Sequence, residues 1–508
     1  MKPATTRSLA LLLALGIAPA ALAQAPDQTN PASPGTLPPA ADAPAGSAAA
    51  AAAPPPAEMP APPPPPTLMT LPAPPPPAPP APPANPPMTS KFAATFYGFV
   101  EFDSIYDSTQ SFNDLAGNAA IARDGSFGAN HHRMIFGVRN SRLGFKLKGP
   151  ETGDIKSSAI AEMDFLGNQP QGSPSPAGSP AVSEGSFFTS PTFRVRHFAL
   201  KLETPVVDVL AGQYWQLFGW QSLFHPNTIE MQGVPGQIYS RSPQLRLSHV
   251  FKSDPVNVEI AIAASRPPQR DAFVPDGQAG IKLAVNHWKG VHTGGAAGTA
   301  LDALSVGVSG VARRFVLPEF AASPVNTVKN SGWGISADAL IPIIPATTVN
   351  DGNALTLTGS FVYGKAIADL YTGLTGGASF AALPANAMGV VGTYPQDIDN
   401  GLFAYTADGV LHRITWQSFM VGAQYYFPTP IRMYISANYS HMKSPNIDAL
   451  GATSTKLFSK SDWFDGTYSI DATASIRFGL EYAQFRQTYV DNVKAKNHRV
   501  QLSAFYIF

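Results

Sequence analysis

Arginine and carboxylate residues recur in this sequence at alternate positions of short segments. Arg194 and Arg196 are two residues apart, and so are Glu162 and Asp164. If these segments are strands, residues two apart lie on the same face. A guanidinium group stays charged in a confined space and binds a carboxylate or phosphate through two hydrogen bonds. Fixed charges of this kind set the electrostatic potential of a narrow, wet passage, and they need no nucleophile or proton relay.

Other kinds of chemistry have weaker support in the sequence. Gly359–Ala366 nearly matches a phosphate-binding loop, but it ends in Ala and alternates like a strand. His131 and His132 are adjacent and therefore point apart, and no third ligand is spaced to complete a metal site. The chain has no cysteine and no Gly-x-Ser-x-Gly, His-Glu-x-x-His or Gly-x-Gly-x-x-Gly motif. We therefore expect no enzyme activity, no bound metal and no cofactor.

The elements that carry these charges have the period of strands from Lys91 onward. In the closing segment, for example, Val500 and Leu502 alternate with Arg499 and Gln501. Sixteen such segments are predicted as strands: 95–107, 132–148, 156–166, 191–203, 206–214, 241–251, 255–265, 279–289, 301–315, 331–341, 353–365, 411–427, 430–441, 462–470, 474–488 and 498–508. An even number of strands is what a closed, single-chain bacterial barrel requires.

The connections between these segments favour a transmembrane barrel over a soluble sandwich. Tight connections such as 149–155 and 252–254 roughly alternate with long ones such as 107–131 and 366–410. Short turns at one end and long loops at the other are typical of outer-membrane barrels. Apolar faces toward lipid and polar faces toward a wet lumen also explain a chain with 44% hydrophobic and only 13% charged residues. We therefore predict an all-β, transmembrane antiparallel barrel.

The first 90 residues have a different composition from the barrel. Residues 1–23 carry Lys2, Arg7, a short apolar run and small residues at a cleavage site, so they are predicted to be a signal peptide. Residues 24–90 are mostly Pro and Ala, and the first 90 residues hold 28 of the 51 prolines. Such a segment cannot offset its own ordering entropy. We expect a disordered periplasmic arm at 24–90, followed by the barrel domain at 91–508.

Several short motifs resemble Gram-negative outer-membrane porins, and most closely the DcaP-like porin family. They are Tyr97–Asp103, Asn140–Lys146, Phe193–Phe198, Ala211–Phe218 and Arg477–Arg486, together with the terminal aromatic Phe508. The resemblance covers about residues 92–508. It implies a 16-stranded homotrimeric barrel in the outer membrane, with the third loop, here Trp215–Ser240, folded inward, and solutes that are anionic and dicarboxylate-like. A helical N-terminal extension would fit the family, but this chain has polyproline there.

Strand parity places two sets of charges on the lumen side. The basic set is Arg142, Arg194, Arg196, Arg241, Arg246, Arg432 and Arg477. The acidic set is Glu101, Asp103, Glu162, Asp164, Glu259 and Glu481. We expect a basic wall opposite an acidic wall, which would orient dipolar solutes and favour anions near the arginines. The alternative is that several of these charges pair with each other only for stability.

Three functions compete on these grounds. The first is a channel for diffusion of small hydrophilic solutes through the outer membrane, favouring anions such as dicarboxylates. The second is a structural envelope protein whose arm at 24–90 contacts peptidoglycan and tethers the outer membrane to the cell wall. The third is a barrel enzyme such as a lipase or protease. A net charge of zero, from 34 basic and 34 acidic residues, removes the electrostatic case for nucleic acid.

Overall fold

The computed structural model describes residues 92–508, except 113, 116–119, 168–187, 222, 230–232, 270–271, 294–297, 373–382, 385–400, 429–431 and 451–457. The predicted signal peptide and arm lie outside the described residues. The wall strands are β1 (Ala93–Asp107), β2 (Arg133–Gly137), β3 (Arg142–Lys148), β4 (Lys156–Gly167), β5 (Thr192–Glu203), β6 (Asp208–Trp215), β7 (Arg241–Phe251), β8 (Val256–Ser265), β9 (Asp276–Thr293), β10 (Thr299–Pro318), β11 (Thr327–Ile344), β12 (Ala354–Lys365), β15 (Thr415–Tyr426), β16 (Arg432–Lys443), β17 (Phe458–Asp471), β18 (Ile476–Tyr489) and β19 (Lys494–Ile507). Smaller elements are the pair β13 (Phe403–Tyr405) and β14 (Leu411–Arg413) and the 3-10 turns η1 (Gly128–Asn130), η2 (Ala368–Leu370) and η3 (Asp448–Leu450).

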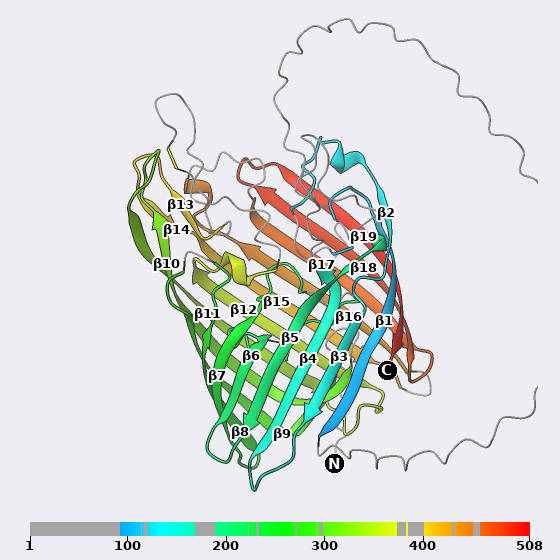
Figure 1. Ribbon diagram of the computed structural model, residues 1–508. Helices are drawn as coiled ribbons and strands as arrows, with labels where there is room; N and C mark the ends of the chain where they lie inside the picture. The colour runs from blue at the N-terminus through cyan, green and yellow to red at the C-terminus, as the bar shows by residue number, and fades with distance from the viewer. Residues whose placement is uncertain are drawn as a thin grey trace, which may run out of the picture. The chain divides into compact units, whose positions relative to one another are not determined.

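The strands close into an antiparallel barrel (Figure 1). The closing pair is β1 with β19, where Phe99 is opposite Ile507 and Asp107 is opposite Arg499. On its other side, β1 pairs with both β2 and β3, which are therefore two halves of one wall strand interrupted at 138–141. Counted this way, the described residues form sixteen wall strands, and each falls on one of the sixteen predicted segments. The prediction is confirmed, although β9, β10 and β11 run several residues further than expected.

The two faces of the barrel wall differ in polarity, as strand alternation predicts. On β19, Leu502 and Tyr506 face outward and are 52% and 56% exposed, whereas Arg499, Gln501 and Ser503 face inward and are buried. A water-soluble protein would place its polar side chains outward. An apolar outer face over a wall whose backbone groups are all paired suits the hydrocarbon of a bilayer. No helix among the described residues has the length and apolar character to cross a membrane.

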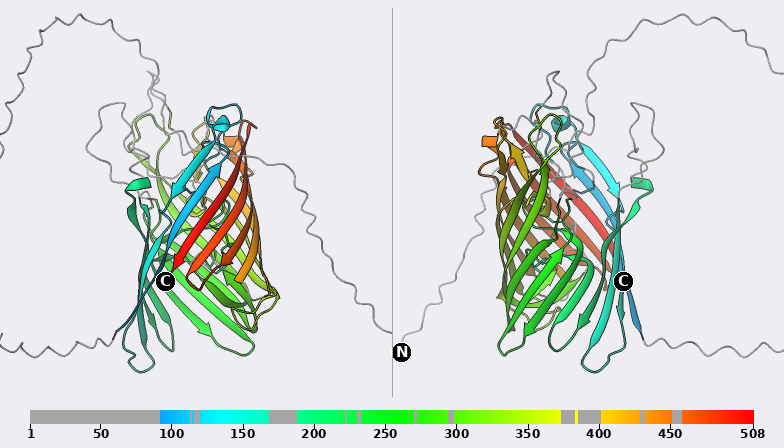
Figure 2. Two further views of the ribbon diagram at one scale, coloured as in Figure 1. Left: turned by 90° about the vertical axis from the view of Figure 1, so that its right-hand side faces the viewer. Right: turned by 60° about the vertical axis from the view of Figure 1, so that its left-hand side comes forward.

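The two ends of the barrel also differ. At one end the strands are joined by short turns, including 204–207, 252–255 and 472–475, and β1 begins and β19 ends there (Figure 1). At the opposite end the connections are long, as at 108–132, 216–240 and 366–414. The strands are visibly tilted against the barrel axis (Figure 2), which closure of a barrel requires. We call these the turn end and the loop end; in outer-membrane barrels the short turns face the periplasm.

Candidate functional site

The loop between β6 and β7, residues 216–240, is called the inner loop, because its described residues (216–221, 223–229 and 233–240) lie inside the barrel. At its start, the backbone N–H of Phe218 donates to Gln278 of β9 at 2.9 Å, and that of Gly219 donates to Ser309 of β10 at 2.8 Å. These contacts turn the chain inward directly after β6. The loop position that the family resemblance implied is the one observed.

Further along, the inner loop reaches strands on the far side of the barrel. The backbone N–H of Ile229 donates to Glu481 of β18 at 2.7 Å, and the carbonyl of Asn227 accepts from Asn438 of β16 at 2.8 Å. The inner loop therefore crosses the lumen from the β6–β10 side to the β16–β18 side. Lumen-facing polar side chains of the wall satisfy its backbone, which a buried loop requires.

Four arginines gather beside the inner loop, and four of their contacts are ion pairs with two carboxylates of β4. Arg196 lies 2.7 Å from Glu162 and 3.0 Å from Asp164, while Arg194 donates to both oxygens of Asp164 at 2.9 and 2.6 Å. We expected Glu162 and Asp164 to oppose the arginines, and that expectation was wrong. They lie on β4, between β3 and β5, so they are part of the basic wall.

The other two arginines, Arg142 of β3 and Arg241 of β7, are less well neutralised. Arg142 is 4% exposed, and its Nε lies 3.7 Å from Glu162, beyond hydrogen-bonding range. Among the described residues, no hydrogen-bond partner is found for Nε and one terminal nitrogen of Arg142, or for one terminal nitrogen of Arg241. Arg241 instead lies over the ring of Trp215 at 4.8 Å. A buried charged donor without an acceptor is costly, so these groups are prepared to bind an anion or water.

The charge of this arginine cluster follows from its members. Its cations are Arg142, Arg194, Arg196 and Arg241, and its anions are Glu162 and Asp164. Four guanidinium groups against two carboxylates leave two positive charges in a buried, partly apolar setting. Charges in such a setting act over longer distances than in bulk water.

A second set of inward-facing carboxylates, on β1, β17 and β18, accepts hydrogen bonds from neutral groups. Because β1 pairs directly with β3, the strand of Arg142, Glu101 and Asp103 do not face the arginines from an opposite wall, and that expectation was wrong for them. Glu101 accepts from Asn140 at 2.8 Å, Asp103 from Gln501 at 3.0 Å, and Glu481 from Thr467 at 2.7 Å. A further member, Asp465 of β17, is fully buried and accepts from Asn438 at 2.7 Å. Asp465 was not among the predicted lumen charges, although parity places it on the inward face of β17 together with Trp463 and Thr467.

The remaining predicted residues lie apart from the arginine cluster. Arg246 donates to the carbonyl of Trp215 and to Gln244, both near the base of the inner loop. Glu259 of β8 pairs with Lys282 of β9 at 2.6 Å. Arg432 and Arg477 lie near the turn end and share Asp471, at 3.8 and 2.5 Å. Arg246, Glu259 and the two arginines at Asp471 therefore have local partners. They do not join the arginine cluster or the carboxylates of β1, β17 and β18.

A second loop segment braces the inner loop. Residues 366–372, which begin the long connection after β12, run beside it: the N–H of Tyr239 donates to Leu370 and that of Thr372 donates to Gln237, both at 2.9 Å. Asp369 of η2 anchors this segment to Arg313 of β10. Side chains of both loops belong to one buried apolar cluster with the wall, including Phe218, Ile238, Ile367, Leu370, Tyr371, Trp416 and Met420. The sequence did not point to this contact.

Comparisons with known proteins agree with this architecture. No protein-family model and no curated protein matches the sequence. Among solved structures, the outer membrane channel DcaP of Acinetobacter baumannii has a TM-score of 0.57 at 18% identity, covering 82% of this chain and 97% of that one. An anion-selective porin from Comamonas acidovorans has a TM-score of 0.45 at 12% identity, covering 82% of this chain and all of its own. The similarity is one of fold. With its closed sixteen-strand wall and apolar outer surface, the chain has the same barrel fold as the outer membrane channel DcaP.

Proposed function

We propose that this protein is a channel for diffusion of small hydrophilic solutes through the outer membrane, with a preference for anions such as dicarboxylates. The observation that carries the proposal is the pair Arg142 and Arg241, each with a buried N–H group for which the described part of the chain supplies no acceptor beside the inner loop. A carboxylate would supply those acceptors, and it would meet a cluster with two uncompensated positive charges. The enzyme alternative has no comparable support in the described residues.

Charges of opposite sign on different strands support orientation of the solute as well as its attraction. The arginine cluster lies on β3, β5 and β7, and the buried carboxylates Asp465 and Glu481 lie on β17 and β18, several strands further round the sheet. A solute with both an anionic and a cationic or dipolar end would align between these two groups of charges. We infer that small anions pass closest to the arginines.

Single-channel recording in planar bilayers tests this proposal. The wild-type protein should conduct, and its reversal potential in asymmetric KCl should indicate anion preference. The double variant Arg142→Gln with Arg241→Gln should still conduct but lose most of that preference. Arg266→Gln, an exposed loop-end position that also removes one positive charge, is the matched control and should behave as wild type. An unchanged reversal potential in the double variant would refute the anion preference, and absence of conductance would refute the channel.

We also propose a homotrimer. The wall strands on the β5–β6 side are short, with eight residues in β6 against twenty in β10. Phenylalanines are exposed on β5 and on the nearby strands β1 and β2: Phe198 of β5 is 67% and Phe136 of β2 is 61% exposed, and Phe102 of β1 stacks on Phe136 at 5.8 Å. Phe136→Arg with Phe198→Arg should dissociate the trimer in native mass spectrometry, whereas Phe361→Arg on β12 should not. A wild-type mass of one chain would contradict the trimer.

The arm at 24–90 supports a second role, as a tether to peptidoglycan. The observation that favours it is the start of β1 at Ala93 on the turn end, which is the periplasmic end in outer-membrane barrels. An arm that leaves there enters the periplasm, and consecutive prolines extend it by about 3.1 Å per residue. Deleting 24–90 should leave conductance intact and weaken the envelope toward detergent. If envelope integrity is unchanged, the arm is a passive linker.

A further inference from the structure

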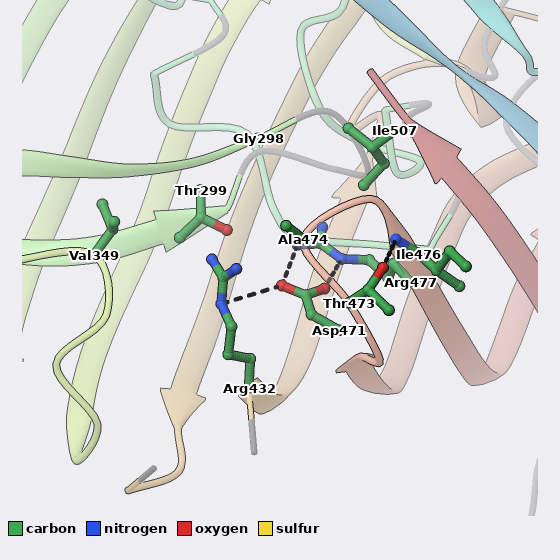
Figure 3. Close-up of a pocket in the computed structure, with 10 residues that line it drawn as sticks. All are labelled: Gly298, Thr299, Val349, Arg432, Asp471, Thr473, Ala474, Ile476, Arg477 and Ile507. Carbon is green, nitrogen blue, oxygen red and sulfur yellow. Dashed lines mark hydrogen bonds and ion pairs between the residues drawn. The ribbon is translucent and has the colours of Figure 1, made fainter. Parts of the chain in front are cut away.

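A cavity of about 150 Å³ lies at the turn end of the barrel, away from the strands that carry the arginine cluster (Figure 3). Its wall comes from six elements of different parts of the chain. The residues used below are Thr299, Val349, Arg432, Asp471, Arg477 and Ile507. A cavity of this volume holds about five water molecules, at about 30 Å³ each. It is therefore large enough for one small ion and its partners.

The cavity has one positive charge that its carboxylate does not neutralise. Arg477 donates to both oxygens of Asp471, at 2.5 and 3.2 Å, and its side chain is only 6% exposed. Each oxygen of Asp471 therefore accepts a hydrogen bond from Arg477. Arg432 lies 3.8 Å from the same carboxylate with 45% of its side chain exposed, so its donors are not used there. In Figure 3 the Arg432 guanidinium extends toward Thr299 across the cavity.

Other carboxylates near these turns are engaged elsewhere. Asp302, three residues beyond Thr299, lies 3.1 Å from Nδ1 of His292. Asp351, two residues beyond Val349, accepts hydrogen bonds from the backbone and hydroxyl groups of Thr347 and Thr348 in its own turn. These donors hold the pKa of Asp351 below its ordinary value, so it stays an anion facing its own turn. The positive charge of Arg432 is therefore the one directed into the cavity.

A chain of contacts joins the cavity to the arginine cluster. Ile507 lines the cavity and packs against the buried cluster of Phe99, Ile229 and Phe505. The guanidinium carbon of Arg142 lies 5.2 Å from the centre of the Phe99 ring. Apolar side chains therefore separate the cavity with Arg432 from Arg142 of the arginine cluster. Conduction through a selective pore requires binding at several sites, none so strong that the ion cannot leave.

We propose that this cavity is a second, turn-side site for a small oxyanion such as phosphate or a short carboxylate, with Arg432 as its ligand and Asp471 as the group that holds Arg477 in place. Solutes would occupy it between the periplasm and the arginine cluster. Its place on a conduction path rests on the proposed channel function, but its ability to bind an oxyanion does not.

Block of the current from one side of the membrane tests this site. Because the chain has no cysteine, Ser253→Cys in the β7–β8 turn identifies the chamber that the turns face by its reaction with a thiol reagent. Inorganic phosphate added to that chamber should reduce the chloride current of the wild-type protein. Arg432→Gln should need about tenfold more phosphate for half block, since a charge-assisted contact is lost. Arg432→Lys should recover part of the effect, and Arg266→Gln should change nothing.

Calorimetric titration of the detergent-solubilised protein with inorganic phosphate separates this site from the channel function. The wild-type protein should bind at two sites, of which Arg432→Gln loses one and Arg142→Gln weakens the other. If the protein does not conduct but this pattern appears, the channel proposal fails and the turn-side site stands. If Arg432→Gln binds phosphate as the wild type does, or if phosphate blocks the wild-type protein equally from both chambers, the turn-side site is overturned.

Discussion

Arg313 of β10 and Asp369 of η2 form a two-point ion pair, with nitrogen–oxygen distances of 2.5 and 2.7 Å, and neither side chain is exposed. Arg313 also binds Asp276 of β9 at 3.0 Å and donates to the carbonyl of Ala366. Because residues 366–372 run beside the inner loop, this pair fixes both loops to the wall. We therefore expect both loops, and not the inner loop alone, to set the width of the proposed passage.

Asp369→Asn should loosen this brace. Arg313 keeps its ion pair with Asp276, so the substitution weakens the two charge-assisted hydrogen bonds between Arg313 and residue 369, and a bond of this kind typically contributes about 1.5–3 kcal/mol. We expect larger and noisier single-channel conductance, because the segment around η2 and the inner loop move apart. The matched control is Asp491→Asn, which removes a carboxylate from the exposed pair with Arg123 at the loop end. If Asp369→Asn conducts as steadily as this control, the brace does not set the passage.

Gly307→Val should displace the inner loop from the wall. A Cβ atom at Gly307 of β10 would lie 2.6 Å from Cδ1 of Trp220, whose indole N–H donates to the carbonyl of Val308 at 3.2 Å. The added side chain forces Trp220 to shift, so we expect altered tryptophan fluorescence and a changed conductance. At Gly277 of β9 a Cβ atom would have no neighbour within 4 Å, so Gly277→Val should leave both signals unchanged. Identical spectra for the two variants would contradict this packing.

Glu162→Gln should raise anion preference. Glu162 is one of two carboxylates in the arginine cluster and accepts from Arg196 at 2.7 Å and from Tyr97 at 2.9 Å. Neutralising it increases the net positive charge, so the reversal potential should move opposite to that of the Arg142→Gln, Arg241→Gln variant. Glu319→Gln, in the loop after β10, is the control for a distant carboxylate. A shift toward cations would show that the cluster does not control selectivity.

Val421→Arg should destabilise the protein in a bilayer. Val421 faces outward from the middle of β15, between Gly359 and Tyr439, and is 53% exposed. An arginine on the lipid face near mid-membrane costs about 2–4 kcal/mol. Guanidinium unfolding of vesicle-embedded protein should show this loss in free energy of unfolding. Val325→Arg, 87% exposed in the β10–β11 loop, should show almost none. Equal stabilities would mean that Val421 does not face lipid.

The sequence alone determined the wall of this protein. The inward or outward direction of Arg499, Gln501 and Leu502 depends only on position along a strand, because successive side chains alternate. The same alternation predicted all sixteen wall strands and the polar lumen face. The spacing between the strand segments predicted the unequal connections. The inward loop came from resemblance to a family and not from a local pattern.

Only the tertiary structure decided which charges meet. Glu162 and Asp164 pair with Arg194 and Arg196 because β4 and β5 lie side by side, with two register shifts that parity cannot reveal. The contact of Ile229 with Glu481 joins residues 252 apart in the chain. Strand parity assigns a face, but it does not order the strands around the barrel or place a loop within it. Those depend on closure of the sheet and on long-range packing, which are not local properties of the sequence.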